Sequence, residues 1–171
     1  MAVVNKKSEA ITNNTATPRV LNDSNLEGGL VRSSAGVVDV AIADSTSSTL
    51  RFCKIPSNAR PTSLKMWCPD IGTTSAMNIG LWSHADADNT GTVIDADFFA
   101  TDYTVTAALA GAEILHEGDV TPGYNILRGE KMIWEALGLS SDPGVHYDVV
   151  AQLTGAIDAT GAVKLECQFV V

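Results

Sequence analysis

The segment from Asp86 to Asp97 has the residue types and the spacing of a calcium-binding loop. Its ligands would be Asp86, Asp88, Thr90 and Asp97, at positions one, three, five and twelve around a glycine at position six. Calcium prefers oxygen ligands at these positions, although the usual twelfth residue is a bidentate glutamate. The preceding Gly80-Leu81-Trp82-Ser83 is typical of a strand rather than of an entering helix. A calcium site is therefore one hypothesis for this segment, and an acidic loop between two strands is the other.

The remaining polar residues form no recognised catalytic or cofactor motif. The histidines, far apart in the sequence and without the paired spacing of zinc ligands, are His84, His116 and His146. The carboxylates that could form a glycosidase pair are Asp70, Asp95, Asp97 and Asp102, but their spacing selects no pair. The sequence contains neither the Gly-x-Ser-x-Gly turn of a hydrolase nor a Gly-x-Gly-x-x-Gly phosphate loop. We therefore expect neither an enzyme nor a bound cofactor.

The overall charge excludes one large class of partner. The chain has 171 residues and a formal net charge of −9 at pH 7. Nucleic-acid binding requires clustered Lys and Arg, and Lys6-Lys7 is the single adjacent basic pair in the sequence. We therefore expect no direct contact with nucleic acid.

The apolar residues and the cysteines indicate where the chain resides. No run approaches the roughly 18 apolar residues that a membrane span needs, so we expect no membrane association. The first seven residues lack the apolar region of a secretory signal. Cys53, Cys68 and Cys167 are odd in number and show no paired spacing. We expect three reduced thiols in a protein made in a cytoplasm.

Alternating apolar and polar residues predict strands along most of the chain, because one face of a strand is buried and the other is wet. The predicted strands are 37–42, 50–55, 62–67, 77–83, 146–153 and 162–170. Two segments, 95–110 and 130–138, are predicted to hold short helical turns, the first after an Asp N-cap and the second closed by Gly138. The predicted core aromatic and apolar residues are Phe52, Trp67, Leu81, Trp82 and Trp134.

Several short strands separated by turn residues, with little helix, indicate a mainly all-β protein. We predict a jelly-roll-like β-sandwich or barrel with one or two short helices. Residues 37–171 form this single domain, and residues 1–36 form an extended N-terminal arm that is rich in Asn, Thr, Ser and Gly. Such a polar segment either remains disordered or becomes ordered on a neighbouring subunit. In the second case its isolated apolar residues would bind the partner: Ile11, Val20, Leu21 and Leu26.

The order of these segments resembles a family of small virion proteins of tailed bacteriophages. The residues that carry the resemblance are 51–60, Asn78–Trp82, Asp95–Ala100, Leu137–Gly144, Tyr147–Val149 and the leader from Met1 to Pro18. The resemblance implies a head cement or decoration protein, with a jelly-roll-like body, that staples neighbouring major capsid protein subunits together. The protein would be made in the host cytoplasm and reside on the capsid surface of the virion.

The resemblance leaves the oligomeric state and the type of virion component open. Binding sites on two-fold or three-fold axes of a capsid suit a homodimer or a homotrimer equally. The alternatives are a head–tail connector, a tail protein and a carbohydrate-binding β-sandwich, with an enzyme as the weakest. Aromatic residues make up only 6% of the chain, which is a small supply for a carbohydrate-binding face.

Overall fold

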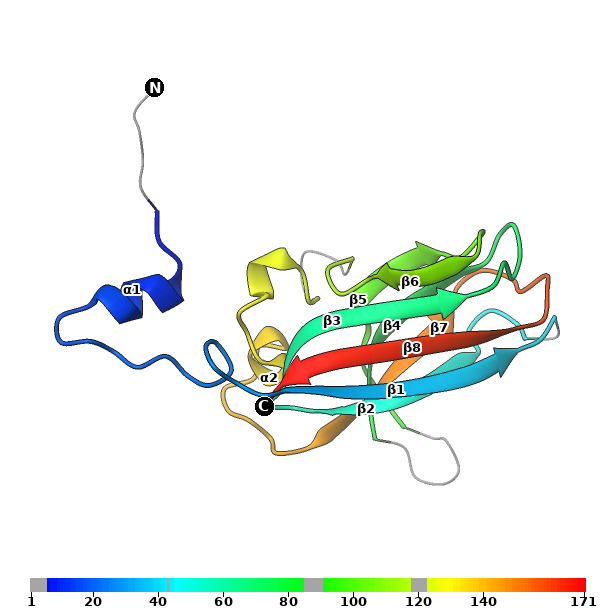
Figure 1. The fold of residues 1–171 in the computed structure, drawn as a ribbon. Helices are drawn as coiled ribbons and strands as arrows, with labels where there is room; N and C mark the ends of the chain where they lie inside the picture. The colour runs from blue at the N-terminus through cyan, green and yellow to red at the C-terminus, as the bar shows by residue number, and fades with distance from the viewer. Residues whose placement is uncertain (1–5, 43, 85–90, 118–122) are drawn as a thin grey trace.

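The computed structural model describes residues 6–42, 44–84, 91–117 and 123–171 (Figure 1). Within these residues, strands dominate and three short helices accompany them. The strands are β1 (Val31–Val40), β2 (Thr49–Pro56), β3 (Arg60–Cys68), β4 (Ala76–Ser83), β5 (Val93–Thr104), β6 (Leu109–Glu113), β7 (His146–Leu153) and β8 (Gly161–Val170). The helices are α1 (Glu9–Thr15), the 3-10 helix η1 (Ile126–Arg128) and α2 (Ile133–Ala136).

The strands form two four-stranded antiparallel sheets that pack face to face. One sheet has the order β1-β8-β3-β6 and the other has the order β2-β7-β4-β5. Every connection passes from one sheet to the other except the one between β4 and β5, which are neighbours. Eight strands in this order are the jelly-roll arrangement. The prediction of a mainly β, sandwich-like fold is confirmed.

The core lies between the sheets, and on β8 it is built from alternate residues. These buried residues are Val163, Leu165, Cys167 and Phe169, and Val170 at the end of the strand is buried as well. Of the predicted core residues, Phe52, Leu81 and Trp82 are buried. Trp67 and Trp134 are only half-buried, so their assignment to the core was wrong. Trp67 faces outward from β3, where the Lys164 Nζ lies 4.2 Å from the ring centroid.

All three cysteines are free thiols, as the sequence predicted. Burial raises the pKa of Cys53 and of Cys68 to about 11, and it raises the pKa of Cys167 as well. A raised pKa keeps the thiol protonated and unreactive at neutral pH. These cysteines therefore act as small apolar side chains of the core.

The predicted helical turns within residues 95–110 are wrong, because this segment forms strand β5 and the start of β6. The alternation of a strand is hidden here by three consecutive buried residues, Phe98, Phe99 and Ala100. They are buried together because β5 bulges: Leu81 of β4 pairs with Asp95, whereas Ile79 pairs with Ala100. The second predicted turn is confirmed as α2, which is followed by Gly138 with a φ of +76°.

The N-terminal arm projects from the end of the sandwich where β1 begins and β8 ends (Figure 1). Strand β1 begins at Val31, inside the segment predicted as arm, because residues 31–36 pair with the last residues of β8. The arm also contains a helix, α1, whose N-cap is Ser8 and whose first turn carries Glu9. Among the described residues, no helix combines the length and the apolar character needed to cross a membrane.

Candidate interaction surface

Residues 6–22, which we call the hook, fold back on themselves. The chain returns alongside α1, so that the Val20 backbone N–H donates to the Asn13 carbonyl at 3.2 Å. Asn22 bridges the two limbs, since its Nδ2 donates to the Ala10 carbonyl and its Oδ1 accepts from Asn13 Nδ2. Glu27 accepts hydrogen bonds from Asn14 and Asn22, which lower the pKa of its carboxyl and keep it ionised. The hook is therefore preformed rather than extended.

Residues 23–29 attach the hook to the sandwich. Arg60 of β3 donates through Nε to the Asn25 carbonyl, and Asn25 Nδ2 contacts the Met132 sulfur at 3.7 Å. Leu26 is half-buried in a cleft of about 290 Å³ between the arm and α2. Within the described part of the chain, the hydrogen bonds of the hook itself are made to residues 6–27. Glu9 of α1 lines the same cleft as Met132 and Glu135, so the hook approaches the body there. The rest of the hook projects away from the sandwich (Figure 1).

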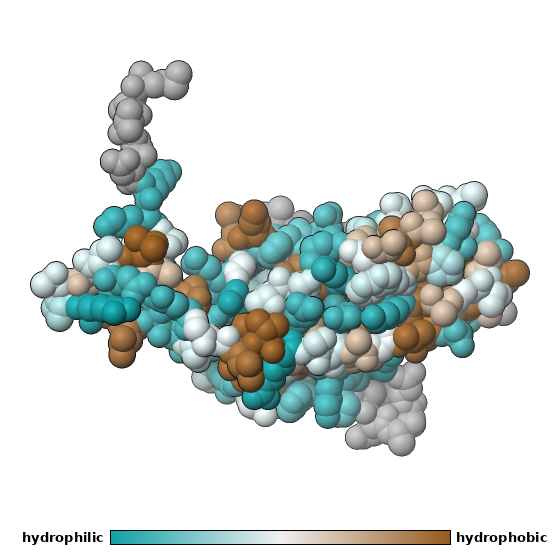
Figure 2. Space-filling model, viewed as in Figure 1, coloured by the Kyte–Doolittle hydropathy of each residue, from teal (hydrophilic) through white to brown (hydrophobic). Residues whose placement is uncertain are grey.

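The hook exposes large apolar side chains. Leu21 is 82% exposed, and Ile11 and Val20 are each 49% exposed. Figure 2 shows apolar surface on opposite sides of the hook. Three of the four predicted arm residues are therefore available to a partner. Leu26 is the exception, because it already packs in the cleft beside α2.

Sequence reasoning missed a second exposed apolar group, at η1. Ile126 and Leu127 are 79% and 81% exposed. The segment that holds them, yellow in Figure 1, lies toward the end of the sandwich that bears the arm. Leu30 and Val31, where the arm enters β1, are also exposed. The signal was present as two adjacent large apolar residues outside any alternating segment. This end of the protein is consequently rich in uncovered apolar surface, which is typical of an interaction site.

A hollow of about 550 Å³ opens beside the start of β7. It is lined by Ser83, His84, Ile94, Val145, His146 and Tyr147. An ionised carboxylate lies next to it, because Asp142 accepts from the Ser57 hydroxyl, which in turn accepts from the Val145 backbone N–H at 3.2 Å. The hydrogen bond from Ser57 lowers the pKa of Asp142. The hollow is therefore lined by three large apolar side chains and two histidines, and a carboxylate lies two hydrogen bonds away from its lining residue Val145.

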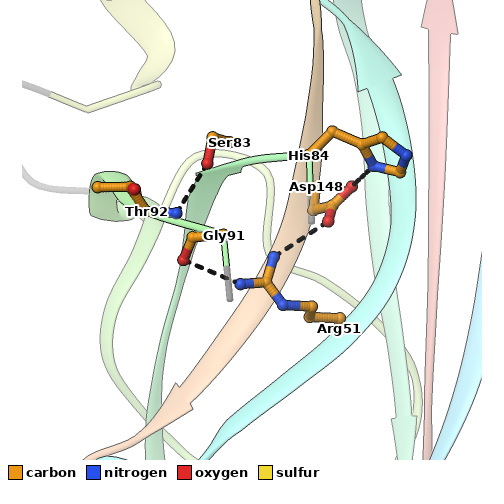
Figure 3. A network of polar contacts seen from close by, with 6 residues as sticks. All are labelled: Arg51, Ser83, His84, Gly91, Thr92 and Asp148. Carbon is orange, nitrogen blue, oxygen red and sulfur yellow. Dashed lines mark hydrogen bonds and ion pairs between the residues drawn. The ribbon is translucent and has the colours of Figure 1, made fainter. Parts of the chain in front are cut away.

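A polar network fixes the wall of this hollow (Figure 3). Asp148 of β7 accepts from Arg51 Nη1 of β2 at 3.0 Å, and its other oxygen lies 2.6 Å from Nδ1 of His84. Arg51 Nη2 also donates to the Gly91 carbonyl at 3.1 Å. Arg51 and Asp148 are largely buried and of opposite charge. The network thus ties β2 and β7 to both ends of the β4–β5 connection, and we interpret it as structural.

Asp95 and Asp97 are brought together by the bulge in β5. Asp95 is 8% exposed, and its Oδ1 accepts from the Asp97 backbone N–H at 3.4 Å. Its Oδ2 is buried without a hydrogen-bond partner among the described residues. Burial raises the pKa of Asp95 to about 6, and the neighbouring Asp97 adds to the rise. Asp95 is therefore partly protonated at mildly acidic pH and ionised above it.

We expect Asp95→Asn to stabilise the protein at neutral pH by about 1–2 kcal/mol. The folded state holds a proton on Asp95 up to a pH of about 6, whereas the unfolded state releases it near 3.8. The contribution of Asp95 to the free energy of unfolding is therefore fully present below pH 3.8, and it is lost as the pH rises through about 6. Urea unfolding across this range should show a smaller loss of stability for the variant than for the natural chain. Asp102→Asn, an exposed change on the same strand, should leave the loss unchanged.

The predicted calcium ligands lie mostly outside the described residues. Asp86, Asp88 and Thr90 belong to the segment 85–90, and only Asp97 is described. Asp97 is on β5, and its Oδ2 accepts from the Thr101 hydroxyl at 3.3 Å. Among the described residues, no group of three or more His, Cys, Asp or Glu side chains could hold a metal ion. The calcium site stays a prediction.

Comparison with known proteins relates the fold to two solved structures. No protein-family model matches the sequence, and no curated protein matches it significantly. A chain of the cyanophage Pam1 capsid asymmetric unit is 16% identical with a TM-score of 0.54, over 100% of this chain and 99% of that one. A chain of the capsid of Ralstonia phage GP4 is 16% identical with a TM-score of 0.55, over 83% of this chain and 84% of that one. These similarities establish a shared fold.

Proposed function

We propose that this protein is a capsid cement or decoration protein, which binds neighbouring major capsid protein subunits on a phage head. The observation that carries the proposal is the preformed hook, which holds exposed apolar side chains away from a rigid jelly-roll body. Fold-sharing chains in two phage capsids support the same role. The protein would act by binding rather than by catalysis, on the outer surface of the virion, after synthesis in the host cytoplasm.

The hook and the body supply complementary parts of such a role. A clamp that binds only the assembled shell stabilises that shell by mass action. Because the hook is ordered by its own hydrogen bonds, little conformational entropy is lost when it binds. The acidic body disfavours adhesion to packaged nucleic acid. Self-association into a dimer or trimer would match the symmetry axes of a shell.

The proposal is tested with heads of the phage that encodes the chain, prepared without this protein. The purified protein should co-sediment with expanded heads, and electron cryo-microscopy should show it between capsid subunits across the shell. Decorated heads should also resist heat or chelator better than bare heads. Density confined to the portal vertex would instead indicate a head–tail connector, and density in the tail would indicate a tail protein. Either result would overturn the cement role.

A carbohydrate-binding role has less support. Trp67 is an outward aromatic residue on a sheet face, but Lys164 lies over its ring at 4.2 Å. A sugar would have to displace this cation before it could stack on the ring.

A further inference from the structure

The hook carries one short segment in which a cation precedes two apolar side chains. Arg19, Val20 and Leu21 form the return limb, and Leu21 is the most exposed large apolar residue of the described chain at 82%. Arg19 donates a hydrogen bond of 2.8 Å to Asn14 within the hook, and its charge also helps to lower the pKa of Glu27. The segment is therefore rigid at its base and uncovered at its apolar side chains.

The hollow beside β7 has the complementary character. Ile94, Val145 and Tyr147 supply the apolar part of the lining, beside His84 and His146, and the Asp142 carboxylate is linked to Val145 through the Ser57 hydroxyl. A volume of about 550 Å³ is sufficient for two branched aliphatic side chains. Val20 and Leu21 thus match the apolar part of the hollow, and the preceding Arg19 is opposite in charge to Asp142.

The distribution of charge indicates that the hook binds the hollow of a second copy of the chain. Residues 6–22 contain Lys6, Lys7 and Arg19 against Glu9, and Glu27, which accepts hydrogen bonds from the hook, leaves it with a net charge of +1. Residues 31–171 contain eight Lys and Arg against seventeen Asp and Glu. The hook therefore has a small net positive charge and the body is acidic, while most of the hook projects away from the body of its own chain (Figure 1). Attraction between opposite charges favours the contact between two copies.

We propose that Val20 and Leu21 of one copy insert into the hollow of a second copy, with Arg19 facing Asp142. This inference rests on the proposed function, in which the hook is a binding element, and it names a second copy of the chain as the partner of the hook. Repeated around a symmetry axis, it joins copies by exchange of their hooks. The hook then links cement subunits to each other, and the linked subunits bind the shell together, so that loss of the hook also weakens binding to heads.

The association is measured on the full chain without heads, by sedimentation equilibrium. The natural chain should form a dimer or trimer that weakens as salt is added, because part of the contact is electrostatic. Leu21→Asp in the hook and Val145→Asp in the hollow should each weaken association by about tenfold or more. Ile42→Asp, at an exposed apolar residue of the β1–β2 connection, is the matched control and should have no effect. Melting curves identify any variant that has lost its fold.

A charge exchange tests the pairing directly. Arg19→Asp and Asp142→Arg should each weaken association, and the double variant should recover part of it, since only facing residues can compensate. A natural chain that stays monomeric, or one whose association is insensitive to Leu21→Asp or to Val145→Asp, would overturn the inference. If Leu21→Asp abolishes binding to heads while the natural chain is monomeric, the hook binds the capsid shell instead. That result would leave the proposed function intact.

Discussion

Deletion of residues 1–22 is expected to reduce binding to phage heads to background, while the sandwich keeps its thermal stability. Each of the three exposed apolar side chains of the hook is able to act as a binding anchor, and loss of one such anchor typically costs about 2 kcal/mol or more. Removing all three at once should therefore lower the affinity by about a hundredfold or more.

The body should tolerate this deletion because the hook makes its hydrogen bonds within the arm. The truncated chain retains residues 23–29, so that the contacts of Asn25 with Arg60 and Met132 are preserved. Circular dichroism melting should give nearly the same Tm for both chains. Binding is measured by co-sedimentation with bare heads.

Leu21→Asp in the full chain is the matched control for this deletion. It removes one anchor without shortening the arm and should produce an intermediate loss of binding. Undiminished binding of the truncated chain would show that the hook has no part in decoration, and the proposed role of the arm would be rejected.

Gly80→Val is expected to destabilise the sandwich by about 3 kcal/mol or more, which is enough to leave a domain of this kind partly unfolded. Gly80 lies in the centre of β4, where the bulge of β5 brings the backbone close to it. A Cβ at this position would lie 2.1 Å from the Asp95 carbonyl oxygen and 2.5 Å from the Ala96 carbonyl carbon. Backbone atoms cannot move aside as a flexible side chain can, so the bulge itself would have to shift.

Gly129→Ala is the control for the Gly80 variant. Gly129 follows η1 with a φ of −60°, and a Cβ there would meet its nearest atom, the Ile126 carbonyl oxygen, at 3.6 Å. This change should be neutral or slightly stabilising, because alanine restricts the unfolded chain. Chemical denaturation monitored by tryptophan fluorescence compares both variants with the natural chain. Equal stability of Gly80→Val and the natural chain would contradict the close approach of β5 to β4.

Local patterns in the sequence were sufficient to predict those elements whose structure depends on the spacing of neighbouring residues alone. The alternation in residues 50–55 and 162–170 predicted β2 and β8 because the two faces of a strand have different neighbours. The Asn- and Ser-rich leader predicted an arm outside the core, since such residues cannot bury enough apolar surface. Ser8 followed by Glu9 was an available signal for α1, and it was overlooked.

Features that combine distant residues could not be read in this way. Strand β5 was mistaken for helix because its bulge buries Phe98, Phe99 and Ala100 together, and that bulge exists only against β4. The hook depends on Asn22 reaching back to α1, which the composition of the arm does not reveal.

The candidate binding features also fall into those that local sequence determines and those that depend on contacts between distant segments. By itself the sequence determined that this chain forms a β-sandwich, that its leader is polar with isolated apolar residues, and that its net charge is negative. Only the tertiary structure decided that Leu21 is uncovered whereas Leu26 is packed beside α2, and that Ile94 and Val145 share one hollow. The physical reason is that burial and enclosure are properties of contacts between segments, and the order of strands that creates those contacts is set by the packing of the whole core.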